Sequence, residues 1–146
     1  MITIGAVTSA DRPAWDVLFT GYNVFYGRTP GQEFLDRAWA RFEPDTDLHA
    51  IGAKLDGELV GIAHFLVHPS TTAADVCYLQ DLFTSEAARG KGVASALIAA
   101  ITDWARDRGC SRVYWMTHEG NATARRLYDQ VGVHKGFIQY QIPLEG

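Results

Sequence analysis

Apolar residues follow two different periods along this chain of 146 residues. In some segments they form short β-branched runs or alternate with polar residues, which predicts strands. In other segments they recur every three or four positions, which predicts amphipathic helices. The expected strands cover residues 2–7, 48–55, 59–67, 76–83, 112–117 and 137–144. The expected helices cover residues 13 to about 21, 32–42, 93 up to the glycine at 109, and 121–130.

Turn-forming residues mark where these elements end. Pro13 suits a first helical turn, and the aromatic and glycine-rich segment Gly21–Gly31 is expected to break the first helix and form a loop. The pair Asp56-Gly57 lies between two apolar runs and predicts a type I′ hairpin turn. Gly109 suits the stop of the long helix.

The order of these elements is β-α-α-β-β-β-α-β-α-β. It predicts the α/β (α+β) class, with one domain over residues 1–146 in which helices flank a mixed sheet. Hydrophobic residues make up 47% and charged residues 21% of the chain, as in an ordinary globular protein. The net charge is −4 and no long basic run exists, so nucleic acid and anionic membranes are not expected partners.

The two cysteines, Cys77 and Cys110, are too few for a disulfide framework and are expected to be reduced thiols. The first residues lack the basic start and the apolar run of a signal peptide, and no stretch has the length of a membrane span. These features predict a cytoplasmic protein.

The stretch Arg89-Gly90-Lys91-Gly92 joins the strand at 76–83 to the longest helix. The two glycines remove side chains from the backbone, and the first N–H groups of the helix carry partial positive charge. With the two basic side chains at the rim, the stretch predicts a cradle for a phosphate or pyrophosphate group. The alternative is a tight turn whose basic side chains are only solvated.

Two motifs make the resemblance to a family specific. The stretch Arg89-Gly90-Lys91-Gly92-Val93-Ala94 resembles the [QR]-x-x-G-x-[GA] loop of the GNAT acyl-CoA N-acyltransferases, which follows the fourth strand there as it does here. The stretch Asn121–Tyr128 resembles the N-x-x-A-x-x-L-Y helix start of that family. The element order also matches, so the resemblance covers nearly the whole chain and implies the GNAT fold, with a mixed, mostly antiparallel sheet.

A narrower likeness concerns the strand Tyr78–Phe83, which is similar to that of the histone and polyamine type of small acetyltransferase. Gln80 stands where the diamine enzymes of that branch carry a glutamate linked to amine deprotonation. This departure leaves both the base and polyamine specificity open.

The resemblance implies that acetyl-CoA is the co-substrate and that its acetyl group passes directly to a primary amine of a small molecule or of a protein. The alternative is a non-catalytic acyl-CoA-binding sensor of the same fold. The backbone of Leu82, Phe83 and Thr84 is implied to bind the pantetheine arm and thioester. The loop of Arg89, Gly90, Lys91, Gly92, Val93 and Ala94 is implied to bind the pyrophosphate.

Five further residues are candidates for the chemistry. Tyr128 is implied as the acid that protonates the leaving thiolate, or else it packs on the sheet. Asn121 is implied to bind the pantetheine amide, to cap its helix, or both. Asp81 is the candidate base, or a buried carboxylate satisfied by a donor, while Glu119 and His118 could also reach the amine, as could a water relay.

Aromatic faces beside a carboxylate suit a cationic acceptor. We therefore expect a pocket in which Tyr22, Phe25 and Tyr26 face Asp81 and Tyr78, unless this aromatic segment is only core. A metal site at His64 and His68 is not expected, because no third ligand has a plausible spacing. The apolar strand at 137–144 is expected near a sheet edge, where it would pair with a second copy to form a homodimer.

Overall fold

The computed structural model describes residues 1–145, which form two compact units. The first unit, Met1–Met116, contains the strands β1 (Ile2–Ala6), β2 (His49–Leu55), β3 (Glu58–His68), β4 (Val76–Thr84) and β5 (Val113–Tyr114), and the helices α1 (Arg12–Phe25), α2 (Gln32–Phe42) and α3 (Val93–Asp107). Short 3-10 turns at Ser9–Asp11 and Glu86–Ala88 precede α1 and α3. The second unit begins at Thr117 and contains α4 (Ala122–Val131).

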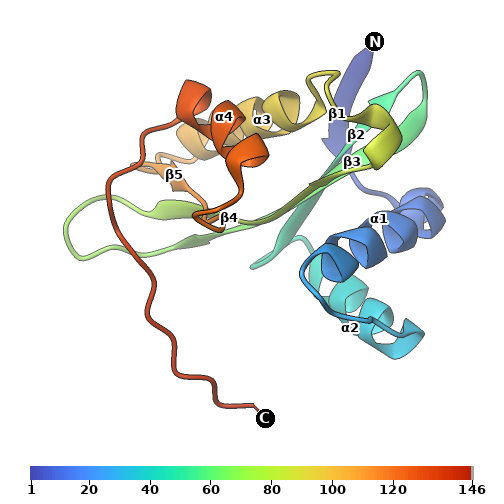
Figure 1. Cartoon of the computed structure of the whole chain (residues 1–146), viewed down its shortest axis with the longest axis horizontal. Helices are drawn as coiled ribbons and strands as arrows, with labels where there is room; N and C mark the ends of the chain where they lie inside the picture. The colour runs from blue at the N-terminus through green and yellow to red at the C-terminus, as the bar shows by residue number, and fades with distance from the viewer. Residues whose placement is uncertain (146) are drawn as a thin grey trace. The chain divides into compact units, whose positions relative to one another are not determined.

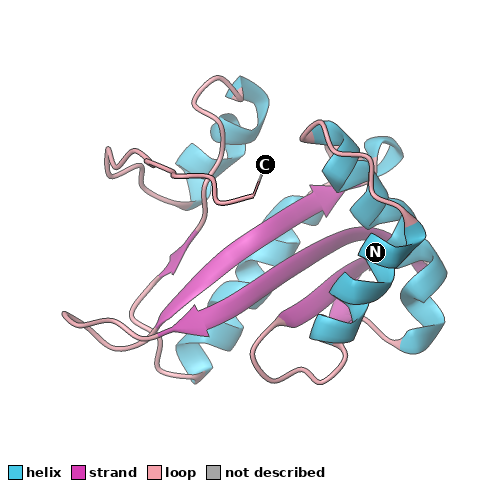
Figure 2. Cartoon of the chain, turned by 90° about the horizontal axis from the view of Figure 1, so that it is seen from below, coloured by secondary structure: helices cyan, strands magenta, loops and turns pink. Residues whose placement is uncertain are grey.

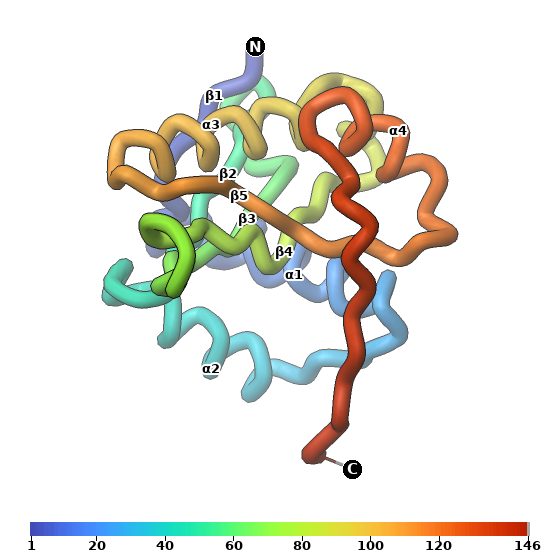
Figure 3. Tube along the Cα trace, turned by 90° about the vertical axis from the view of Figure 1, so that its left-hand side faces the viewer, coloured from blue at the N-terminus to red at the C-terminus, as the bar shows by residue number. Residues whose placement is uncertain are grey.

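The five strands form one sheet in the order β1-β2-β3-β4-β5. Neighbouring strands are antiparallel except β4 and β5, which are parallel and pair only at Cys77–Val113 and Tyr78–Tyr114. The long strands β3 and β4 run through the middle of the sheet (Figure 2). Helices α1 and α2 cover one face and α3 covers the other (Figures 1 and 3). The predicted fold class is therefore confirmed.

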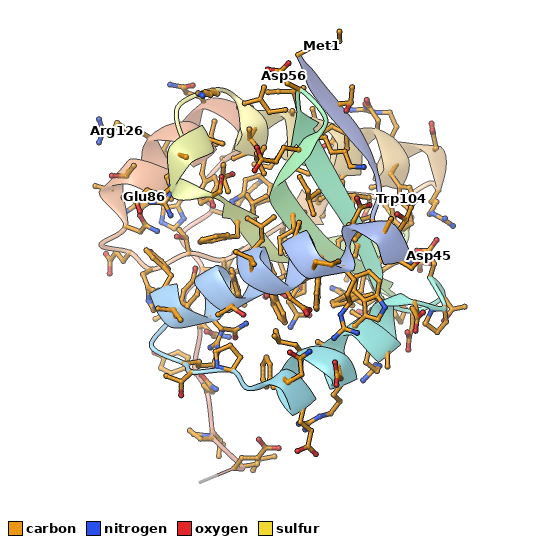
Figure 4. All side chains as sticks on the ribbon, turned by 90° about the vertical axis from the view of Figure 1, so that its right-hand side faces the viewer. Met1, Asp45, Asp56, Glu86, Trp104 and Arg126 are labelled. Carbon is orange, nitrogen blue, oxygen red and sulfur yellow. The ribbon has the colours of Figure 1, made fainter. Side chains whose placement is uncertain are left out.

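The hairpin between β2 and β3 turns at Asp56-Gly57, as predicted. Both residues have positive φ, 52° at Asp56 and 87° at Gly57, which is the signature of a type I′ turn. The terminal ammonium of Met1 lies 3.1 Å from the Asp56 carboxylate, and both labels stand together at the tip of the hairpin in Figure 4. This fixes the start of β1 beside the turn.

The predicted break of the first helix at Gly21 is wrong, because α1 continues to Phe25. A Cβ atom at Gly21 would lie 2.9 Å from the ring of Phe83 on β4. The glycine therefore lets the helix lie directly on the sheet, and its cost in helix propensity, about 1 kcal/mol, is offset by that close packing. Tyr22 and Tyr26 are thus placed by the end of a helix and not by a loop.

Each face of the sheet has its own core. Under α1 and α2, seven residues form a buried cluster: Trp15, Leu18, Phe19, Leu35, Trp39, Leu59 and Ile62. Under α3, Val93, Leu97 and Ile101 of its apolar face are almost fully buried, whereas Trp104 is half-buried. Gly61 on β3 allows this contact, since a Cβ there would lie 2.6 Å from Cγ1 of Val93.

Two predicted strands differ from the structure. The strand expected at 112–117 is only two residues long, because its ladder with β4 ends after Tyr114. The strand expected at 137–144 does not form, and residues 133–145 contain no helix or strand. Alternation marks a segment that is able to pair, but a strand also needs a partner ladder, and among the described residues this segment has none.

Within the second unit, Asn121 caps α4, because its side-chain oxygen accepts a hydrogen bond from the Ala124 N–H at 3.3 Å. The large apolar side chains that follow the helix are exposed: Val133, Phe137, Ile138, Tyr140, Ile142 and Leu144. In the part of the chain that the structure describes, no helix has the length and apolar character needed to cross a membrane.

Candidate active site

A β-bulge in β4 creates the centre of the candidate site. Leu79 lies opposite Phe65 and Asp81 lies opposite His64, so Gln80 is an extra residue without an opposite partner on β3. The bulge shifts the alternation of side chains along β4. Burial is the largest cause that raises the pKa of Tyr78, and the neighbouring Tyr114 is the second. The charge of Asp81 raises this pKa further, so the two side chains lie close together although they are three positions apart.

Asp81 is held by a buried chain of hydrogen bonds. The indole N–H of Trp15 donates to Nε2 of His64 at 3.0 Å, and Nδ1 of His64 lies 2.9 Å from Oδ2 of Asp81. An indole nitrogen only donates, so Nε2 of His64 must accept, and the ring proton is on Nδ1. His64 therefore donates to the carboxylate in one fixed tautomer. The carboxylate itself remains 16% exposed and can be reached by a substrate.

Two tyrosines at the end of α1 complete the surroundings of Asp81. The rings of Tyr22 and Tyr26 lie 5.0 Å apart. Burial raises the pKa of Tyr22 strongly, and the charge of Asp81 together with a hydrogen bond to it raises it further. Burial and the same charge raise the pKa of Tyr26. Both phenols therefore keep their protons, and Tyr22 donates to Asp81. The structure brings Tyr22, Tyr26 and Tyr78 close to Asp81, whereas Phe25 is largely exposed.

Beyond the bulge, β4 offers one edge for binding. Leu82, Phe83 and Thr84 pair with β3 on one side. On the other side the ladder with β5 ends at Tyr78, and the described residues contain no strand that pairs with β4 further along. Backbone groups on this edge are therefore available to an extended ligand, as the predicted role of these three residues requires.

The glycine loop has the geometry of an anion cradle. Gly90 and Gly92 have φ of 79° and 83°, a left-handed backbone that other residues rarely adopt. The first hydrogen bond of α3 runs from the Ala96 N–H to the Gly92 carbonyl, so the N–H groups of the three preceding residues have no acceptor within the helix, and no side chain caps it.

The surroundings of this loop are open. A Cβ at either glycine would meet nothing within 4 Å. Arg89 lies with its guanidinium carbon 5.8 Å from the ring centre of Phe83, and Lys91 is exposed. Free N–H groups, two cations and room for a ligand fit a pyrophosphate group.

The remaining candidates lie in the second unit. The side chain of Asn121 performs the predicted capping role. The backbone carbonyl of Glu119 accepts a hydrogen bond from Arg125 at 2.8 Å. Tyr128 lies on α4 and His118 precedes it. The roles of these residues toward coenzyme and acceptor stay predictions.

His64 and His68 do not act together. Whereas His64 joins Trp15 and Asp81, Nε2 of His68 lies 2.9 Å from the Tyr114 hydroxyl. Among residues 1–145, no group of three or more histidine, cysteine or acidic side chains has the arrangement of a metal site. Cys77 and Cys110 are free thiols. Burial is the main cause that raises the pKa of Cys77 to about 11, and the charge of the nearby Cys110 adds to it.

The sequence reasoning missed three functional candidates. It considered His64 only to reject a metal site, and it assigned no role in the site to Trp15 or Arg28. A histidine within an apolar strand is a weak signal of a functional role. The partners of His64, Trp15 and Asp81, are 49 and 17 residues away along the chain, so the local sequence does not identify them. Arg28 had a local signal, since it follows a helix-ending glycine and an aromatic stripe.

Comparison with known proteins identifies the family of this chain. The model of the acetyltransferase (GNAT) family matches residues 14–133. The D-amino-acid N-acetyltransferase HPA3 of Saccharomyces cerevisiae is 32% identical over 144 residues, which cover 96% of this chain and 89% of that protein. An aminoglycoside N(6′)-acetyltransferase type 1 of Stenotrophomonas maltophilia is 27% identical over 149 residues, covering 98% and 94%.

Solved structures share the fold. The aminoglycoside acetyltransferase AAC(6′)-Iy in complex with a bisubstrate analogue superposes with a TM-score of 0.83 at 19% identity, covering 98% of this chain and 99% of that one. A protein of Bacillus halodurans described as a transcriptional regulator superposes with a TM-score of 0.87 at 22% identity, covering 99% and 100%. At these identities the likeness concerns the fold alone.

Proposed function

Because this chain belongs to the acetyltransferase (GNAT) family and is an acetyl-CoA-dependent N-acetyltransferase, we propose that its acceptor is the primary amine of an amino acid or a similar small molecule. The observation that carries this proposal is the position of Asp81. Its carboxylate is partly exposed, is oriented by His64 and Tyr22, and directly precedes the strand segment with a free edge.

Asp81 serves the acceptor in two ways. A primary amine is protonated at neutral pH, so a carboxylate attracts it into the site. The ammonium must then lose a proton before its nitrogen attacks the thioester carbonyl, and Asp81 takes that proton directly or through a water molecule. General base catalysis of this kind contributes about 10²- to 10⁴-fold to a rate. The faces of Tyr22 and Tyr26 stabilise the same cation.

The coenzyme is held by the backbone and the glycine loop. Edge groups of Leu82, Phe83 and Thr84 bind the pantetheine arm and polarise the thioester oxygen. The N–H groups at the start of α3, with Arg89 and Lys91, bind the pyrophosphate. When bound, acetyl-CoA supplies the activated acetyl group. A bond from nitrogen to the acetyl carbon forms, the bond to sulfur breaks, and the sulfur takes up a proton.

We assign that last proton to Tyr128 and the pantetheine amide to Asn121, on the motif that these residues share with the family. Asn121 keeps its Oδ1 for the helix cap, so its Nδ2 is the group that donates to the coenzyme. Glu119 remains a second acidic group for the acceptor.

An amino acid fits better than a polyamine. Gln80, the residue in place of the glutamate of the diamine enzymes, is the exposed extra residue of the bulge. A relative that is similar along 96% of this chain is a D-amino-acid N-acetyltransferase, and others act on aminoglycosides. These names support an acceptor that is a small amine with further polar groups.

The test is thiol release from acetyl-CoA in the presence of amino acids of both chiralities, polyamines, aminoglycosides and a lysine-rich peptide. We expect turnover with amino acids. Asp81→Asn keeps an oxygen that accepts from His64 but removes the charge and the basicity, so kcat/KM should fall by about 10²-fold or more. Asp103→Asn, on the exposed face of α3, is the matched control. An Asp81→Asn enzyme of unchanged activity would refute the role of Asp81.

A further inference from the structure

Arg28 is a fixed cation that the proposed chemistry does not use. Helix α1 ends in a Schellman motif, in which the Gly27 N–H donates to the Val24 carbonyl at 3.0 Å and the Arg28 N–H donates to the Asn23 carbonyl at 2.8 Å. Gly27 has a φ of 78°, as this motif requires. The backbone of Arg28 is therefore set by the end of the helix.

The side chain of Arg28 is held by the same asparagine. Its Nε donates to Oδ1 of Asn23 at 2.7 Å, while Nδ2 of Asn23 donates to the Phe19 carbonyl at 2.8 Å. Asn23 is only 1% exposed, so it is a buried polar side chain whose hydrogen bonds are all made within α1 and Arg28. An exposed arginine that only improves solubility does not need such a buried partner.

The guanidinium lies over the two tyrosines of the candidate site. Its carbon is 5.9 Å from the ring centre of Tyr22 and 5.6 Å from that of Tyr26. Among the ion pairs of residues 1–145, none includes Arg28. Its Nε is used by Asn23, and its terminal nitrogens, which carry four N–H bonds, have no carboxylate partner.

Tyr22 lies between this cation and the carboxylate of Asp81. Its hydroxyl bonds to Asp81, its ring face contacts Arg28, and the two charges shift its pKa in opposite directions. A positive and a negative group are thus presented on two sides of one aromatic ring. The charged groups of an α-amino acid are about 3 Å apart, and a hydrogen bond of about 2.9 Å at each end lets such a molecule bridge two protein groups about 9 Å apart.

We propose that Arg28 binds the carboxylate of an α-amino acid acceptor while Asp81 receives its amine. This inference rests on the proposed function and adds the group that distinguishes an amino acid from a simple amine. An arginine fork matches a carboxylate with two parallel hydrogen bonds. The free terminal nitrogens of Arg28 supply that fork, and Asn23 holds it in place.

The experiment compares the kcat/KM of an amino acid with that of its amide, which keeps the amine and the side chain but has no carboxylate. We expect the unmodified enzyme to prefer the acid by about 10- to 100-fold, the effect of hydrogen bonds to a charged group. Arg28→Gln should remove this preference by lowering the value for the acid and leaving that for the amide unchanged. Arg28→Lys keeps the charge without the fork and should give an intermediate value.

Arg108→Gln is the matched control, because Arg108 also lies over an aromatic ring, that of Trp104 at 4.0 Å, at the end of another helix. It should not alter the preference for the acid. The KM for acetyl-CoA should be the same in all variants.

Three outcomes would overturn the inference. The first is an equal loss for acid and amide in Arg28→Gln, which would mean a structural role. The second is a raised KM for acetyl-CoA, which would assign Arg28 to the coenzyme. The third is turnover of other amines but of no amino acid, which would leave the acetyltransferase itself intact. Absence of turnover with every amine would instead refute the proposed acceptor chemistry as a whole.

Discussion

Replacement of Trp15 by phenylalanine tests the chain of hydrogen bonds behind Asp81. Trp15 is fully buried, and its ring lies 5.1 Å from those of Phe19 and Trp39. Phenylalanine keeps an aromatic ring at this place but removes the N–H that donates to His64. Nε2 of His64 then has no donor, and the hydrogen bond from Nδ1 to Asp81 loses the support of the Trp15 N–H.

The loss of stability has two parts. A buried nitrogen of His64 without a donor costs about 1–3 kcal/mol. The smaller ring leaves a cavity that costs about 1 kcal/mol more. A total of about 2–4 kcal/mol is a large share of the roughly 5–15 kcal/mol that stabilises a domain. For a chain of this size it lowers Tm by about 5–15 °C.

Urea unfolding of Trp15→Phe should be compared with that of Trp39→Phe. Trp39 belongs to the same buried cluster, and the hydrogen bonds of the described residues include none from its indole. The ring change is therefore the same without the lost donor, and Trp15→Phe should be the less stable variant by about 1–3 kcal/mol.

Nitrogen NMR of the imidazole gives a direct measurement. In the unmodified protein it should show the proton of His64 on Nδ1. A proton on Nε2, or equal stability of the two variants, would refute the chain of hydrogen bonds.

Three further predictions concern other parts of the chain. Gly92→Ala should raise the KM for acetyl-CoA about 10-fold, since the φ of Gly92 is 83°. Gly109→Ala, with a φ of 75° at the other end of α3, should cost similar stability, about 1–2 kcal/mol, without that effect on KM. Equal KM values for acetyl-CoA in the two variants would contradict the role of the glycine loop in binding pyrophosphate. Since the pKa of Cys77 rises from 9.0 to about 11 in the folded protein, its thiol should resist thiol reagents at pH 8 until the protein unfolds, and the stability it contributes should fall as pH rises from 9.0 towards 11. Mass spectrometry distinguishes labelling at Cys77 from labelling at the more exposed Cys110, and rapid labelling of Cys77 in the native protein would argue against its burial. If the exposed apolar segment at 137–144 pairs with a second copy, light scattering should show a dimer at micromolar concentration, and Ile138→Lys with Ile142→Lys should convert it to a monomer; a monomeric unmodified protein would end that proposal.

Local signals in the sequence were sufficient where one short stretch determines the backbone. Asp56-Gly57 has the positive φ values that the turn type requires, and the two glycines before α3 have the left-handed backbone expected of a cradle. Gly21 shows where such reasoning fails. The same residue type has a negative φ in the middle of a helix, and the reason for its presence is the ring of Phe83, 62 positions further along the chain. Nothing near Gly21 in the sequence identifies that ring.

The bulge at Gln80 was missed for a related reason. An apolar strand reads as regular from its own residues, but a bulge is a property of the register between two strands. Only the pairing of Asp81 with His64 shows that one residue of β4 is extra. The acidic residue itself was predictable as a candidate base, whereas the direction of its side chain was not.

The two charged groups proposed for the acceptor share one structural principle. Asp81 is oriented by buried His64, and Arg28 is held by buried Asn23. A buried polar side chain must make its hydrogen bonds, so it fixes the orientation of whichever partner satisfies it. The charged group at the surface of the site thereby loses rotational freedom before a substrate arrives, which reduces the entropy lost on binding. For this reason Asn23→Ala, which leaves Arg28 charged and present, should still weaken binding of the acceptor carboxylate. If KM for the amino acid were unaffected in a folded Asn23→Ala protein, the orientation of Arg28 would be irrelevant to recognition and its charge alone would account for it.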